Sequence, residues 1–173
     1  MRAAAAAKAW RRTLARLSAW AVCALLAACA IVASGAQAAP TLDDFSTAPH
    51  RDWIAISGAS HHFQPDRREW REDNPGAGFE REFTGTPWVA SAGYFRNSYN
   101  RNTFYAGGRW MPLEAGPFRF GAFGLLASGY PSPILILPAI SAQFGRVGAN
   151  LIVLPNLPGY SGYLGLQLRF ALD

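Results

Sequence analysis

The sequence predicts an all-β protein, an eight-stranded antiparallel up-and-down transmembrane β-barrel of outer-membrane type. The clearest observation is a strict alternation between Tyr163 and Asp173, in which the apolar parity is Leu164, Leu166, Leu168, Phe170 and Leu172. A period of two indicates a strand whose two faces meet different surroundings. An N-terminal export signal and connectors of alternating length are the two further observations, and they place the apolar face against lipid.

The export signal is predicted over residues 1–38, which combine a basic start, an apolar stretch and the cleavage pattern Ala36-Gln37-Ala38. An uncleaved membrane anchor is the alternative, although the apolar stretch is short for spanning a bilayer. Lipidation at Cys29 is a second alternative, because Leu26-Ala27-Ala28-Cys29 resembles a lipobox. Export with a cleaved signal peptide predicts a location in the outer membrane of a Gram-negative bacterium.

Composition limits the possible functions. The net charge of +5 equals the contribution of the five basic residues in the signal, so the rest of the chain is neutral and the charge does not indicate nucleic-acid binding. Both cysteines, Cys23 and Cys29, also lie in the signal, which excludes disulfides and cysteine chemistry after cleavage. We expect an N-terminal segment over residues 39–52, with a short turn or helix within 41–50, and one barrel domain over residues 53–173.

Turn residues divide the barrel domain into eight segments with β character. Their expected spans are 53–63, 76–84, 88–97, 103–112, 117–128, 136–144, 146–154 and 161–172. Connectors after the even-numbered segments are short and the others are longer and more polar, as in a small outer-membrane barrel with short periplasmic turns. A soluble lipocalin-like barrel is the alternative, but it would need a charged outer face, and charged residues are sparse after Arg119.

Aromatic residues gather near both expected rims, as interfacial girdles do. The periplasmic group is Trp53, Phe83, Trp88, Trp110, Phe118 and Phe170, and the outer group is Tyr94, Phe95, Phe104, Tyr105, Tyr130, Tyr160 and Tyr163. Arg81 falls on the lipid-facing parity, where it could extend its charge to the interface.

The inward parity predicts two zones in the barrel lumen. The periplasmic half receives a polar set that could form an ion-pair plug: Glu80, Glu82, Arg109, Arg119, Gln143, Gln167 and Arg169. The outer half receives smaller and apolar residues that could line a substrate pocket: Ser57, Ala59, Gly107, Phe123, Leu125, Ala139, Ile152 and Gly165. The alternative is that side chains fill an eight-stranded barrel completely.

Two prolines, Pro138 and Pro155, interrupt segments that otherwise look continuous. Proline lacks the N–H that a strand neighbour needs, so each predicts a gap in pairing. Such gaps could be lateral gates for a lipid chain, or harmless bulges near a rim.

Candidate chemistry lies at the outer rim. His61 and His62 end the first segment, with His61 inward and His62 outward by parity, and Asn97-Ser98 end the third. A histidine that deprotonates a serine hydroxyl suits acyl transfer, although polar residues at loop edges are usually just solvated. No metal site is expected, because two adjacent histidines without a third ligand bind zinc poorly.

Several motifs carry a resemblance to a known family across about residues 53–170. They are the histidine ending the first segment, Asn74-Pro75-Gly76-Ala77-Gly78-Phe79, Asn97-Ser98, the stretch from Pro131 to Pro138, Leu154-Pro155 and Leu168-Arg169-Phe170. On these, the chain resembles the PagP-type lipid A palmitoyltransferases of Gram-negative outer membranes. The resemblance implies an eight-stranded barrel that measures a palmitoyl chain in a pocket and admits it beside prolines.

The resemblance also assigns candidate catalytic residues. It implies that His61 or His62 is the histidine, that Ser98 is the serine, and that Asn97 replaces the family's aspartate. Asparagine can orient a partner but cannot carry a charge. The family's N-terminal amphipathic helix is also not evident in residues 39–50.

Two functions follow. The first is a lipid acyltransferase, palmitoyltransferase-like, which moves an acyl chain from a phospholipid to lipid A without a cofactor. The second is a non-catalytic small outer-membrane barrel that binds apolar molecules or has a structural role. In both we expect a monomer in contact with lipid and not with nucleic acid.

Overall fold

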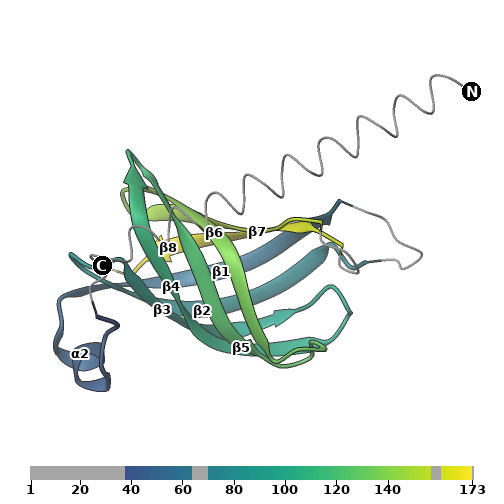
Figure 1. Ribbon diagram of the computed structural model, residues 1–173, viewed down its shortest axis with the longest axis horizontal. Coiled ribbons are helices and arrows are strands. Elements are labelled where there is room, and N and C mark those ends of the chain that lie inside the picture. Colours follow the sequence, from purple (N-terminus) through teal and green to yellow (C-terminus); the bar gives the residue numbers. More distant parts are fainter. Residues whose placement is uncertain (1–37, 64–69, 157–160, 173) are drawn as a thin grey trace, which may run out of the picture.

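The structure is a computed structural model that describes residues 38–63, 70–156 and 161–172. Eight antiparallel strands close into a barrel in the order of the sequence (Figure 1). They are β1 (His50–His62), β2 (Asp73–Phe83), β3 (Trp88–Arg96), β4 (Asn102–Ala115), β5 (Phe118–Ala127), β6 (Ile134–Phe144), β7 (Val147–Leu154) and β8 (Tyr163–Ala171). The predicted fold class is confirmed. The predicted signal cleavage pattern and Cys29 fall outside the described residues, apart from Ala38.

The two ends of the barrel differ as their connectors predict. The turns at one end, called the short-turn end, contain Gly85, Gly116 and Gly145 with φ of 76°, 60° and 63°. These left-handed conformations strain any residue with a side chain, so glycine fixes where each hairpin reverses. The opposite, long-loop end carries the candidate site. β4 continues past Pro112 because a register shift between Trp110 and Leu113 accommodates the proline.

Side-chain burial is inverted relative to a soluble barrel. Apolar side chains are exposed around the outside, with 48% for Ile56, 71% for Ile136 and 44% for both Leu166 and Leu168. Polar side chains are buried inside, where Glu80 and Arg109 are both 0% exposed. A barrel with an apolar outer surface and an ionic interior is suited to a hydrocarbon environment. This pattern therefore contradicts the lipocalin-like alternative.

A polar plug fills the lumen at the short-turn end, as the inward parity predicts. Arg109 donates two hydrogen bonds to Glu80, at 2.8 and 2.6 Å. Arg119 and Arg169 donate one each to Glu82, at 2.7 and 2.9 Å. These five residues, called the lumenal plug, balance most of their charge internally, which is the condition for burying ions.

The N-terminal segment contains one short helix, α2 (Leu42–Thr47), which confirms the expected turn or helix. Thr41 and Asp44 form a capping box at its start, and none of its residues is buried. It lies outside the barrel at the short-turn end, at the lower left of Figure 1. Among the described residues, no helix is long and apolar enough to cross a bilayer.

Arg81 has partners on the outside of the barrel. It donates two hydrogen bonds to its register neighbour Asp52, at 2.8 and 2.7 Å. The ring of Phe45 in α2 lies 4.8 Å from its guanidinium carbon. The charge on the lipid-facing parity is thus neutralised and covered, rather than only extended toward water.

The girdle prediction is wrong for several aromatic residues. Tyr94, Phe104, Phe118 and Phe170 are exposed on the outside, but Trp53, Phe83 and Tyr105 are 0%, 3% and 6% exposed. Closing a small barrel leaves an interior that large side chains must fill, and this demand outweighs their interfacial preference. Tyr160 lies outside the described residues.

We expect Glu80→Gln to lower the free energy of unfolding by about 3–5 kcal/mol, because it leaves Arg109 buried without a counter-ion. Glu114→Gln is the matched control, since Glu114 is 66% exposed and pairs with Arg119 at the rim of the lumen. It should cost no more than about 1 kcal/mol. Urea unfolding in lipid vesicles, followed by tryptophan fluorescence, measures both. Equal losses would show that the plug does not hold the barrel together.

Candidate functional site: a rim cavity with a serine in its wall

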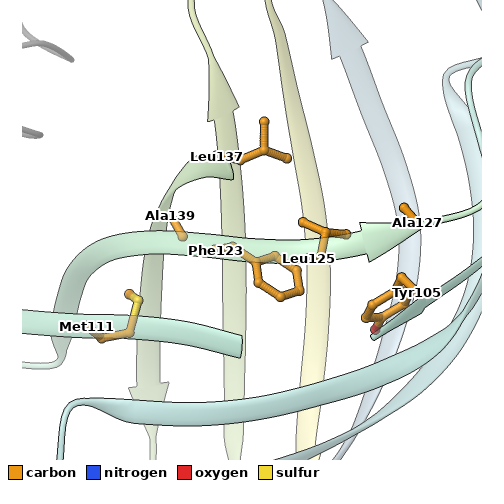
Figure 2. Close-up of a cluster of buried hydrophobic side chains, with 7 residues drawn as sticks. All are labelled: Tyr105, Met111, Phe123, Leu125, Ala127, Leu137 and Ala139. Carbon is orange, nitrogen blue, oxygen red and sulfur yellow. The ribbon is translucent and has the colours of Figure 1, made fainter. Parts of the chain in front are cut away.

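A cavity of about 120 Å³ lies inside the long-loop half of the barrel, above the plug. Part of its wall comes from the buried hydrophobic cluster that Figure 2 shows, in which Tyr105, Phe123, Leu125 and Leu137 project from β4, β5 and β6. We call this space the rim cavity. The lumenal plug and the rim cavity are therefore the two zones that the inward parity predicts.

The rim cavity includes most of the predicted pocket residues. Ala59, Phe123, Leu125, Ile152 and Gly165 line it. Two predicted residues do not. Ala139 is fully buried within the hydrophobic cluster, and a Cβ on Gly107 would collide with the carbonyl oxygen of Gly124, so Gly107 serves the close approach of β4 and β5.

The prediction missed the aromatic part of the lining. Phe95, Tyr130 and Tyr163 also line the rim cavity. The rings of Phe95 and Tyr130 form a connected series with Tyr99 and Tyr105, and the ring of Tyr163 contacts that of His62. The inward parity of Phe95 and Tyr163 indicated that their rings line the lumen. The prediction instead assigned both residues to the outer girdle, because aromatic rings prefer the membrane interface. Burial raises the pKa of Tyr130, which lies between β5 and β6, so its hydroxyl stays protonated at neutral pH.

The floor of the cavity is polar. Gln167 donates from Nε2 to the Ser57 hydroxyl at 3.2 Å and to the Tyr105 hydroxyl at 3.5 Å. Asn150 links this layer to the plug, because its Nδ2 donates both to Gln167 and to Glu80, at 2.9 and 3.0 Å. A continuous hydrogen-bonded network therefore closes the cavity from below.

The predicted orientation of the two histidines is wrong. The His61 side chain is 68% exposed, whereas that of His62 is 7% exposed and stacks on Trp70 at 4.8 Å. The register of β1 shifts between Ser57 and Ala59 against both neighbouring strands. Across this stretch β1 has one residue more than β8 and one fewer than β2, and a shift by one residue exchanges the two faces of β1 beyond it.

Glu72 binds the end of β1. Its Oε1 accepts the backbone N–H of His62 at 2.8 Å and lies 3.2 Å from Nδ1 of His61. The His62 N–H is the main cause that lowers the pKa of Glu72, and the hydrogen bond from His61 adds to it. The carboxylate thus stays ionised at neutral pH and holds the histidine pair at the rim.

Asn97 is buried in a structural role. Its Nδ2 donates to the Thr103 hydroxyl at 2.9 Å and to the Gly129 carbonyl at 3.1 Å. Its Oδ1 accepts the backbone N–H groups of Tyr99 and Arg101, both at 3.0 Å. The amide is therefore fully used within the turn between β3 and β4 and in its link to the β5 end. An aspartate could not supply the two donors, which gives a physical reason for asparagine at this position.

Ser98 lines the rim cavity, and its hydroxyl makes no hydrogen bond within the described parts of the chain. Its carbonyl accepts the backbone N–H of Arg71 at 3.1 Å, so Ser98 lies beside the segment that carries Glu72. No hydrogen bond joins Ser98 to His61 or His62 in these parts. The structure brings the serine and the histidine–glutamate group to one side of the rim without connecting them.

The two prolines border one seam. Register pairs between β6 and β7 end at Ala139 and Ile152. Beyond them, the described residues show no pairing of 134–138 with β7, and Pro138 pairs only toward β5. The prediction that Pro155 interrupts a strand is wrong, because Pro155 follows the last residue of β7. Leu137 and Ile152 line the rim cavity beside this gap.

Metal ligands do not gather in the described ranges, where no group of three or more histidine, cysteine, aspartate or glutamate side chains is arranged to hold a metal ion. No protein-family model and no curated protein matches the sequence. Among solved structures, the chain is similar to the de novo designed protein TMB2.3, determined by NMR in solution. The match has 14% identity and a TM-score of 0.44, and it covers 74% of this chain and 98% of the designed chain. It carries no argument about function.

We expect Asn97→Asp to destabilise the protein by on the order of 1–3 kcal/mol, because the Thr103 hydroxyl and the Gly129 carbonyl lose their donor and a charge is buried. Ser98→Ala is the adjacent control and should leave the unfolding midpoint unchanged. Urea titration of both variants in lipid vesicles measures the difference. If Asn97→Asp were neutral, the amide network would not be the reason for asparagine here.

Proposed function

We propose that this protein is an outer-membrane barrel of a Gram-negative bacterium that holds the end of a lipid acyl chain, or a similarly small apolar group, in the rim cavity. The supporting observation is an apolar space closed from below by a hydrogen-bonded plug. The signal predicted over residues 1–38 would deliver the chain to that membrane, with the long-loop end toward the cell exterior. The plug makes a conducting pore a poor alternative.

The volume of the cavity limits what it holds. A dry cavity of about 150 Å³ is enough for a benzene molecule. At about 120 Å³, the rim cavity suits a small apolar group or the terminal carbons of a chain, and it is too small for a whole palmitoyl chain. A longer chain would need the aromatic side chains in the lining to move.

The gap between β6 and β7 provides a route for such a chain. A lipid tail in the surrounding leaflet would meet unpaired backbone beside Pro138, with Leu137 and Ile152 of the cavity lining directly behind it. Entry from the side keeps the tail in an apolar environment throughout. In this proposal Pro138 and Pro155 therefore border one lateral gate rather than forming two separate gates.

Acyl transfer is the second candidate, favoured by the unpaired Ser98 hydroxyl in the cavity wall. In this reaction Ser98 would attack the ester of a phospholipid while a histidine takes its proton and passes it to the departing lysophospholipid hydroxyl. A hydroxyl of lipid A would then attack the acyl-serine ester, take the acyl group and release Ser98 with its proton restored. His62 would first have to leave its stack on Trp70, and Asn97 would not orient it, since its amide is fully occupied. The binding function requires neither a movement of His62 nor a residue that orients it.

We expect Gly165→Leu to abolish occupancy of the cavity. A Cβ at Gly165 makes only ordinary contacts, at 3.5 Å from Tyr163 and 3.9 Å from Ile152, so the new side chain can enter the space without displacing backbone. Gly124→Leu is the matched control, because Gly124 has the outward parity of β5 and nothing lies within 4 Å of its Cβ position.

The measurement uses protein in lipid nanodiscs and a fatty acid labelled with ¹³C on its terminal methyl. Magnetisation transfer from that methyl to the methyl groups of Leu137 and Ile152 should appear in the original protein and in Gly124→Leu, and disappear in Gly165→Leu. Transfer that persists in Gly165→Leu, or that is absent from the original protein, would remove the support for binding.

Mass spectrometry of lipid A separates the two candidates. If the protein is an acyltransferase, lipid A from expressing cells gains one acyl chain, and Ser98→Ala abolishes this gain while the protein remains folded in the membrane. If it only binds, lipid A is unchanged. Because the Ser98 hydroxyl makes no hydrogen bond to any residue that the structure describes, loss of the gain could not be assigned to misfolding.

A further inference from the structure

Arg96 lies on the outside of the barrel at the long-loop end. It is the last residue of β3 and shares the outward parity of Tyr94. The exposed rings of Tyr94 and Phe104 pack together at 5.2 Å, as aromatic residues do at a membrane interface. The Tyr94 hydroxyl and Nη1 of Arg96 both donate to Oδ1 of Asn102, at 3.0 and 3.1 Å. The guanidinium is therefore fixed just beyond the aromatic level.

A second arginine shares a ligand with Arg96. Nε of Arg96 and Nη1 of Arg71 both donate to Oδ1 of Asn100, at 3.0 and 3.3 Å. Asn100 reaches them from a left-handed conformation, with φ of 61°. Two cations bound to one neutral oxygen repel each other, and an anion placed between them would relieve this repulsion.

The nearby carboxylates leave Arg96 without a counter-ion. Asp73 pairs with Arg71 at 3.2 Å and is 77% exposed, while Glu72 is occupied by His62 and His61. Within the described residues, Arg96 has no ion pair. Only two of its five N–H groups are used, by Asn100 and Asn102, so three remain for a ligand.

We propose that Arg96 and Arg71, held by Asn100 and Asn102, form a binding site for the phosphate of a lipid headgroup in the leaflet at the long-loop end. A guanidinium offers parallel donors that fit phosphate oxygens. Two cations favour a phosphomonoester, which carries a charge of about −1.5 to −2 at neutral pH, over a phosphodiester with a single charge. This arginine rim site lies outside the barrel wall and does not depend on the rim cavity or on acyl transfer.

The test uses the protein in phosphatidylcholine nanodiscs that contain either phosphatidic acid, a phosphomonoester, or phosphatidylglycerol, a phosphodiester. Native mass spectrometry counts the lipids that stay bound to the protein after it is released from the nanodisc. We expect phosphatidic acid to be retained in preference to phosphatidylglycerol. Arg96→Gln should weaken this retention about tenfold, because a hydrogen bond to a charged group is lost. Arg96→Lys should recover part of it, since it keeps the charge without the parallel donors.

Arg146→Gln is the matched control. It removes the same charge from an exposed position between β6 and β7 at the short-turn end, and its lipid retention should equal that of the original protein. The shift in gel mobility on heating verifies that each variant is folded. Equal retention by Arg96→Gln and Arg146→Gln would overturn the site. Displacement of the lipid by millimolar inorganic phosphate would also overturn it, by assigning the arginines to free phosphate.

Discussion

The bidentate pair of Glu80 and Arg109 is the interaction on which the interior of this barrel depends. Both side chains are fully buried, so their desolvation must be offset by nearly complete hydrogen bonding. Asn150 supplies a third bond to Glu80, and Arg169 lies 3.6 Å from it while bonding to Glu82. Trp53 closes the group from one side, with its ring 4.2 Å from the Arg169 guanidinium. The barrel can stay closed and ionic inside because these partners meet at one level.

The plug also determines where a cavity can exist. Ionic and amide groups fill the lumen as far as Gln167, whose contacts with Ser57 and Tyr105 form the floor of the cavity. Above this floor most lining residues are small or apolar, and the polar side chains of Ser60 and Asn74 are hydrogen-bonded to each other. Gly165 leaves space beside Ile152. Water in that space would find few partners, so an apolar occupant is favoured over water. The position of the proposed ligand thus follows from where the hydrogen-bonded network ends.

The alternation of residues was enough to predict the strands, the plug and much of the cavity, because period-two patterning survives wherever a strand is regular. It failed beyond the bulge of β1, where a register shift of one residue against each neighbouring strand exchanges His61 and His62 between the two faces. Gly58 within the bulge gave no distinctive signal, since glycine is also frequent in the regular strands of this chain. The role of Asn97 could not be predicted either, because its partners Thr103 and Gly129 lie in other elements of the fold.

In the turn between β3 and β4, neutral amides hold the neighbouring side chains on both faces of the barrel wall. Asn97 faces the interior of the turn beside Ser98, whereas Asn100 and Asn102 hold Arg96 outside the wall. The gap between β6 and β7 lies three strands around the barrel from β3. A lipid bound by its phosphate at Arg96 would therefore not be the one whose tail enters at Pro138. If both proposals hold, the protein contacts two lipid molecules at once, one by its headgroup and one by its chain.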